Sequence, residues 1–287
     1  MRGVEASRLA PGLELPPDTP AALRAEVERR EARLIDLERG RYQHPRRTYL
    51  AFDTPSGRVH AHYSAKPEDG PLFAHEVAVR DLVGREGPLR APAVLASGPN
   101  WMLAATVEPE SLPPDVAVER IVAAALRVAE LELPPSPWPR RPGGRLGVIG
   151  RRLRLLRSPV STRDVVAARR IVAECPLPLV TSHGSYQRNH VFLADGAAWV
   201  IDWEHSGKRP LGFDLMHYWS NLDDPQLRDL VFARTVEALG PRHERELKRL
   251  RYALLVRMIA GKFVDDAQPE GARRLLTVLP AVREDAY

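Results

Sequence analysis

A short stretch in the second half of the sequence constrains the fold more than any other. Two apolar, β-prone runs, residues 191–194 and 197–201, flank Asp195-Gly196, a pair that readily takes the positive φ angles of a type I′ turn. This pattern predicts a tight antiparallel hairpin. A hairpin returns the residues on either side of it to the same end of the two strands, so we expect the polar side chains there to cluster. They are His183, Ser185, Asn189 and His190 before the hairpin, and Asp202 and Glu204 after it. The alternative is an ordinary surface hairpin.

This stretch resembles the catalytic segment of the aminoglycoside phosphotransferase and choline kinase superfamily. That signature consists of His-Gly-Asp, a short spacer ending in Asn, a hairpin, and Ile-Asp-Trp/Phe-Glu. His183-Gly184, the predicted hairpin and the run 201–204 match it. The resemblance implies an α+β, two-lobed protein-kinase-like fold with a small antiparallel-sheet N-lobe and a mainly helical C-lobe. It also implies ATP or GTP, with Mg²⁺, as the cofactor, and His183 as a member of the catalytic loop.

Two of the positions that carry the chemistry of this superfamily are changed here. In the superfamily the loop Asp orients the substrate hydroxyl and accepts its proton, the Asn binds magnesium, and the Asp after the hairpin bridges metal and phosphates. The first two positions are occupied by Ser185 and His190, and only the third, Asp202, is intact. Asn189 would supply the amide if the loop shifted by one residue, because magnesium prefers oxygen to imidazole nitrogen. Glu204 is the nearest carboxylate in sequence that would orient a hydroxyl in place of Ser185.

A second segment of the superfamily pattern follows the hairpin. Residues 210–215 look like its Asp-Pro-x-x-Asp-Leu motif, although the first Asp is missing. The resemblance implies that Asp214 braces the catalytic loop through backbone hydrogen bonds.

The N-terminal part carries a possible phosphate-binding pair. Residues 59–66 alternate apolar and polar side chains, as a half-buried strand does, and Lys66 ends that strand. Glu76 lies in a helical pattern over 72–83. A strand lysine paired with a helix glutamate fixes nucleotide phosphates in kinase folds. Lys66 is the only lysine before Lys208, so it is the one candidate, and a solvated strand end is the other interpretation.

Other nucleotide contacts are expected from the backbone and from arginine. Residues 91–95 and 101–107 are predicted to form strands, and the resemblance places adenine against the main chain near Ala105 and Val107. The stretch 40–47, expected to cover the phosphates, has a single glycine and no Gly-rich motif. Arg41 and Arg46, with their neighbour Arg47, would offset this with guanidinium contacts, unless they form a solvated face.

Composition limits the remaining possibilities. The chain has 287 residues, 44% of them hydrophobic, which suits one two-lobed domain or two closely packed ones. We expect residues 1–108 to form an N-terminal helix and the nucleotide-binding N-lobe, and residues 109–287 to form the C-lobe with the catalytic hairpin. Residues 20–39 show a charged helical pattern, and residues 227–239 and 244–263 supply late helices.

Partners and location follow from charge and hydropathy. No apolar run approaches the roughly twenty residues that cross a bilayer, and no secretory signal is visible, so a cytoplasmic protein is expected. The lone Cys175 suggests no redox chemistry. The net charge is +5, but the arginine-rich run at 140–157 lacks aromatic residues for base stacking, so a nucleic-acid partner is not favoured.

Two functions compete at this point. One is a phosphotransferase that moves a γ-phosphoryl group onto a hydroxyl of a small molecule or a peptide. The other is a pseudokinase, a binding or scaffold protein that keeps the fold and not the catalysis. For a substrate, a cationic compound is one hypothesis, because four aspartates adjoin the late helices: Asp223, Asp224, Asp265 and Asp266.

Overall fold

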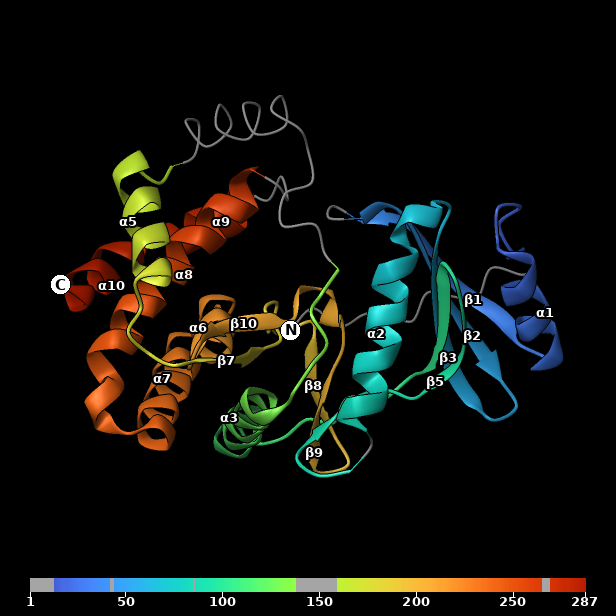
Figure 1. Ribbon diagram of the computed structural model, residues 1–287, viewed down its shortest axis with the longest axis horizontal. Helices are drawn as coiled ribbons and strands as arrows, with labels where there is room; N and C mark the ends of the chain where they lie inside the picture. Colours follow the sequence, from blue (N-terminus) through green and yellow to red (C-terminus); the bar gives the residue numbers. More distant parts are fainter. Residues whose placement is uncertain (1–12, 42–43, 85, 138–158, 265–268) are drawn as a thin grey trace. The chain divides into compact units, whose positions relative to one another are not determined.

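The computed structural model describes residues 13–41, 44–84, 86–137, 159–264 and 269–287. It divides into two compact units (Figure 1). We refer to residues 1–77 with 92–107 as the N-terminal unit, and to residues 78–91 with 108–287 as the C-terminal unit. The predicted α+β class is confirmed: an antiparallel sheet dominates the first unit, and the second is largely helical.

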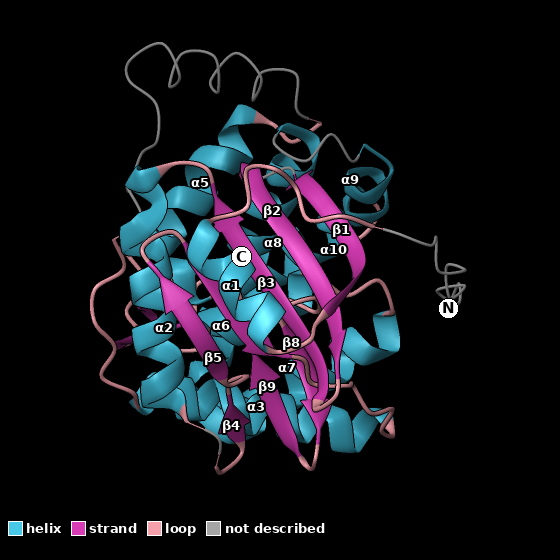
Figure 2. Ribbon diagram, turned by 90° about the vertical axis from the view of Figure 1, so that its right-hand side faces the viewer, coloured by secondary structure: helices cyan, strands magenta, loops and turns pink. Residues whose placement is uncertain are grey.

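The N-terminal unit is an antiparallel sheet with the strand order β1-β2-β3-β6-β5 (Figure 2). Alternation decides its two faces, because Val59, Ala61 and Tyr63 of β3 join one apolar cluster with Leu23 and Val27 of α1. The polar residues of β3 therefore lie on the other face. The elements are α1 Ala21–Arg29, β1 Arg33–Arg41, β2 His44–Thr54, β3 Gly57–Ser64, β5 Val94–Gly98 and β6 Trp101–Ala105.

The helix predicted for residues 20–39 is wrong in its second half. Helix α1 ends at Arg29, Glu31 has a positive φ of 51°, and β1 begins at Arg33. A register shift in β1 follows Leu34, and Leu34 and Leu37 both pack in the apolar cluster of the sheet. Apolar residues three apart fit a helix face, and a bulged strand reproduces that spacing.

The C-terminal unit has two small sheets and most of the helices. The three-stranded sheet has the order β4-β9-β8, and β7 pairs with β10. Its strands are β4 Leu89–Arg90, β7 Leu179–Ser182, β8 Val191–Ala194, β9 Ala197–Val200 and β10 Gly207–Pro210. The helices are α2 Gly70–Val83, which begins in the N-terminal unit, α3 Pro114–Glu130, α5 Thr162–Ala173, α6 Phe213–Ser220, α7 Pro225–Leu239, α8 Glu244–Val264, α9 Pro269–Leu276 and α10 Leu279–Ala286. Three short 3₁₀ helices are η1 Pro67–Asp69, η2 Trp203–His205 and η3 Pro241–His243.

The predicted hairpin is confirmed. Strands β8 and β9 are antiparallel with Ala194 opposite Ala197, and Asp195 and Gly196 have φ angles of 49° and 72°. Both central residues of the turn are thus in the left-handed region, as a type I′ turn requires. The predicted helices at 72–83, 227–239 and 244–263 are also present, as α2, α7 and α8.

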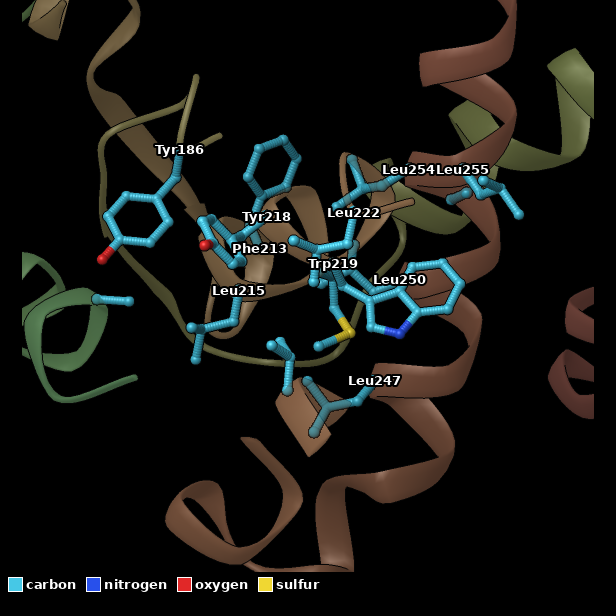
Figure 3. Close-up of a cluster of buried hydrophobic side chains, with 14 of the residues drawn as sticks. Tyr186, Phe213, Leu215, Tyr218, Trp219, Leu222, Leu247, Leu250, Leu254 and Leu255 are labelled. Atoms are coloured by element: carbon cyan, nitrogen blue, oxygen red, sulfur yellow. The ribbon is translucent and has the colours of Figure 1, made fainter. Parts of the chain in front are cut away.

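Helix α8 organises the core of the C-terminal unit. Buried leucines of α8 share one cluster with the aromatic residues of α6, and Tyr186 of the loop after β7 joins this cluster through Tyr218, with the ring centroids 6.0 Å apart (Figure 3). Trp219 lies in this cluster, with the guanidinium groups of Arg228 and Arg251 at 5.2 and 5.1 Å from its ring. The loop is therefore built on a rigid apolar base. In the part of the chain that the structure describes, every helix is too short or too polar to span a bilayer.

One carboxylate links three of these helices. Asp164 of α5 accepts hydrogen bonds from the hydroxyl of Tyr252 on α8 at 2.6 Å and from Arg283 of α10 at 2.7 Å. Ser161 donates its hydroxyl to it at 2.6 Å. Burial alone would raise the pKa of Asp164, but these donors hold that pKa below its ordinary value. The ionised carboxylate therefore stabilises the fold at neutral pH.

We predict that Asp164→Ala lowers the free energy of unfolding by about 2 to 4 kcal/mol, because it leaves the buried Tyr252 hydroxyl unpaired and removes the ion pair with Arg283. Urea denaturation at pH 7 measures this loss. Because the folded-state pKa is depressed, the contribution should be lost as the pH falls below about 4. The control Glu237→Ala removes an exposed carboxylate of α7 and should cost less than about 0.5 kcal/mol. Equal losses in the two variants would contradict this role for Asp164.

Candidate functional site

The loop that the resemblance singles out runs from His183 to His190 and is anchored at both ends. It follows β7, which pairs with β10 along its whole length. At the other end, the backbone N–H of Ile201 donates to the carbonyl of His190 at 3.0 Å. The loop therefore begins and ends on hydrogen-bonded strands, and its side chains have fixed starting points.

Asp214, the second residue of α6, braces the start of this loop. Its carboxylate accepts hydrogen bonds from the hydroxyl of Ser182 at 2.7 Å, the N–H of His183 at 2.8 Å and the N–H of Gly184 at 3.0 Å. The brace implied by the resemblance is confirmed by these contacts. Burial raises the pKa of Asp214, whereas the three donors and the nearby Arg209 charge oppose that shift.

His183 is completely buried and joins the loop to the end of the hairpin. Its Nε2 lies 2.9 Å from the carbonyl oxygen of Ile201, and its Nδ1 lies 3.3 Å from the backbone nitrogen of Ser185. The neutral tautomer with the proton on Nε2 satisfies both contacts. Its ring meets Trp203 edge to face, with the centroids 4.7 Å apart. The geometry makes His183 a positioning residue.

Within the loop, His190 contacts Ser185. Nδ1 of His190 lies 2.9 Å from the carbonyl oxygen of Ser185, and the hydroxyl of buried Ser185 accepts from Gln187 at 3.3 Å. Nε2 of His190 lies 3.2 Å from a carboxylate oxygen of Asp202, which has a left-handed φ of 68° after the hairpin. The side chain of Asn189 is exposed. The structure thus places His190, and not Asn189, against Asp202.

This arrangement does not fit a magnesium ion. Magnesium prefers hard oxygen ligands in near-octahedral geometry, and the protein carboxylate available for it, Asp202, faces an imidazole. Among the described residues, no group of three or more His, Cys, Asp and Glu side chains is placed to hold a metal. Glu204 lies in η2 and is buried.

Lys66 and Glu76, the predicted phosphate-binding pair, both belong to the N-terminal unit. The ammonium group of Lys66 lies 3.3 Å from the carboxylate of Glu68, and Glu76 is buried in α2. Lys66 caps the short helix η1, and Glu68 lies in the first turn of that helix, so the exposed pair forms locally. Whether Lys66 and Glu76 serve a nucleotide stays a prediction.

Sequence reasoning overlooked the position of Arg47. It is buried on β2, and its guanidinium carbon lies 5.1 Å from the ring centroid of Phe73, one turn before Glu76 on α2. Leu50 and Phe52 of the same strand point into the apolar cluster, so alternation sends Arg47 to the opposite face. That alternation was the sequence signal for a buried cation here. The side chains of Arg41 and Arg46 lie outside the described residues.

The backbone expected to read adenine is partly used by the sheet. The N–H of Ala105 donates to Ala93 at 2.9 Å, and that of Thr106 donates to Arg58 at 3.0 Å. Within the described part of the chain, the N–H of Val107 has no hydrogen-bond partner. Val107 is therefore the better donor of the two positions predicted.

Comparison with known proteins supports the fold. Neither a protein-family model nor a curated protein matches this sequence. The apo form of a thermostable mutant of aminoglycoside phosphotransferase APH(4)-Ia is similar, with a TM-score of 0.61 and 14% identity over 90% of this chain and 98% of that one. Plasmodium vivax ethanolamine kinase gives a TM-score of 0.57 and 10% identity over 94% and 86% of the two chains. A putative fructosamine-3-kinase from Thermobifida fusca gives 0.52 and 18% over 91% and 99%. The chain thus has the α+β kinase-like fold of these small-molecule phosphotransferases.

We predict that Asp214→Ala lowers the free energy of unfolding by about 2 to 4 kcal/mol, because three donors lose their buried acceptor. Amide hydrogen exchange of His183 and Gly184 should also become faster, since their N–H groups lose their acceptor. The matched control is Asp223→Ala, an exposed aspartate of the same unit, which should leave both measurements unchanged. Unchanged exchange at His183 and Gly184 in the Asp214 variant would contradict the brace.

Proposed function

We propose that this chain is a nucleotide-binding protein of the phosphotransferase fold whose loop does not transfer phosphoryl groups at an ordinary enzymatic rate. It is in this sense a pseudokinase. The observation that carries the proposal is the position of the His190 ring, between the Ser185 carbonyl and the Asp202 carboxylate. That ring takes the place where an asparagine oxygen and a metal would otherwise face Asp202.

The chemistry of phosphoryl transfer explains why this matters. The transition state is loose, so catalysis depends on positioning and on neutralising charge, mainly by magnesium and cationic side chains. A general base adds roughly 10²- to 10⁴-fold. Ser185 supplies no carboxylate for that task, and His190 is a poor magnesium ligand. Either replacement alone would slow the reaction. Both together remove the carboxylate that orients the acceptor hydroxyl and one of the magnesium ligands.

Several features support a nucleotide as the ligand, ATP or GTP. A solved structure of aminoglycoside phosphotransferase APH(4)-Ia that is similar to this chain, with a TM-score of 0.57, is a ternary complex with ADP and hygromycin B. In the N-terminal unit, Val107 offers an unused N–H to a nucleobase, and Lys66 is a partly exposed cation whose local partner, Glu68, is more exposed still. Exchange of Glu68 for a phosphate would cost little, because surface ion pairs are weak.

An active phosphotransferase is the second candidate. It would transfer the γ-phosphoryl group to a hydroxyl of a small molecule or peptide, with Ser185 or Glu204 orienting that hydroxyl. The complete brace by Asp214 favours it, because a loop that needed no catalytic geometry would not require three directed hydrogen bonds.

The first test concerns metal dependence of binding. We predict that ATP or GTP binds the wild-type chain with the same affinity in magnesium and in EDTA, measured by calorimetry. His190→Asn frees Asp202 and supplies an amide oxygen, so magnesium should raise its affinity by about tenfold, the equivalent of one good contact. The control Asn189→Ala changes the exposed neighbour and should behave as the wild type. Wild-type binding that requires magnesium would overturn the proposal.

The second test restores the loop. We predict that the double variant Ser185→Asp with His190→Asn gains nucleotide hydrolysis in magnesium, by roughly 10²- to 10⁴-fold over the wild type. Release of inorganic phosphate measures the rate, and Ser185→Ala with His190→Asn is the control without a base. A wild-type chain that phosphorylates an identified hydroxyl compound at an ordinary enzymatic rate would instead establish the second candidate.

A further inference from the structure

Two arginines from different elements lie on one aromatic ring next to the catalytic loop. The guanidinium carbon of Arg209, on β10, lies 5.2 Å from the ring centroid of Phe213, and that of Arg257, on α8, lies 5.8 Å from it. Phe213 is the first residue of α6 and precedes the brace residue Asp214. The guanidinium groups of Arg209 and Arg257 therefore both lie near the ring of Phe213.

Arg209 lies against the backbone of the loop at Gly184. Gly184 has a φ of 80°, and a Cβ placed on it would lie 2.8 Å from Nη2 of Arg209. The guanidinium group thus packs against the loop backbone in space that only glycine leaves. Its charge is partly balanced, because Asp214 acts on it electrostatically.

The charge of Arg257 has no such balance. Its side chain is exposed, and among the described residues its guanidinium group makes no ion pair or hydrogen bond. Partial desolvation, followed by the like charges of Arg209 and Arg169, lowers the pKa of Arg257, but an arginine remains charged at neutral pH. His217, one turn along α6, adds no compensating charge: burial, followed by Arg257, lowers its pKa to about 3, so it is neutral.

Two of the four aspartates considered for a cationic ligand, Asp223 and Asp224, lie in the described part of the chain. Asp224 caps helix α7, where its carboxylate accepts from the N–H of Gln226 at 2.9 Å. Asp223 is exposed and acts electrostatically on Arg228 of the same helix. Asp265 and Asp266 lie outside the described residues.

We propose that Arg257 and Arg209 bind an anionic group, a phosphate or a carboxylate, on the compound that this loop receives. Planar guanidinium groups match both oxyanions with paired hydrogen bonds, and the ring of Phe213 holds the two groups in place. Isolated surface arginines are usually solvated. Here, two of them converge on the ring of Phe213, and Asp214 acts electrostatically on Arg209 alone, which leaves the charge of Arg257 uncompensated. The inference rests on the proposed function in one respect, that the loop faces a second ligand besides the nucleotide.

Calorimetry of the full chain, saturated with ATP so that phosphate probes do not enter the nucleotide site, tests this proposal. Glucose 6-phosphate and gluconate represent the two anions, glucose is the neutral match, and choline is a cation. We predict binding of at least one anionic probe, and no binding of glucose or choline. Arg257→Ala should weaken the anion by about tenfold or more, because a charge-assisted hydrogen bond is lost, and Arg257→Lys should lose less.

The matched control is Arg245→Ala, which removes the same charge from an exposed position of the same helix and should leave anion binding unchanged. Equal losses in the Arg257 and Arg245 variants would overturn the proposal, and so would tighter binding of choline than of either anion. A direct titration with ATP separates this proposal from the proposed function. If ATP does not bind, the proposed function fails, and the anion titrations then test the present inference independently of it. If ATP binds and no anionic probe does, the present inference alone fails.

Discussion

The buried carboxylate of Asp214 is the interaction on which the rest of the site depends. Gly184 turns the chain after β7 with a left-handed φ, so its N–H and that of His183 cannot join the β7–β10 ladder. Unpaired, each would cost about 1 to 3 kcal/mol. Asp214 accepts both, and Arg209 offsets the desolvation of its charge. The direction of the whole loop follows from this one acceptor.

Local signals in the sequence were sufficient for the hairpin and for the long helices. Asp195-Gly196 determines a turn by its backbone preferences, and the apolar periodicity of α7 and α8 extends over many residues. The same periodicity misled at residues 20–39, because a bulged strand presents Leu34 and Leu37 to one side as a helix would. Spacing decides an element only when no irregular strand can reproduce it.

The site was less predictable, because its contacts depend on packing between distant elements. The hairpin brought His190 to Asp202, which follows from chain geometry alone. No spacing rule brings Arg209 and Arg257 to Phe213, since strand, helix and loop must first pack around α8. The contact of Lys66 with Glu68 was not predicted either. A flexible surface lysine pairs with the nearest carboxylate, whereas a helix glutamate is buried by its own face.

The changes in the loop and the arginines beside it have one electrostatic consequence. A phosphotransferase loop of the usual type carries two carboxylates and relies on divalent cations to bring phosphate to them. Here Ser185 stands at the position of the first carboxylate, and the second carboxylate, Asp202, faces His190. Arg209 and Arg257 add positive charge from protein side chains. An anion then meets a site that needs no metal to be attractive. In the anion site that we propose, the neutral side chain of Ser185 and the cations Arg209 and Arg257 favour the same class of ligand.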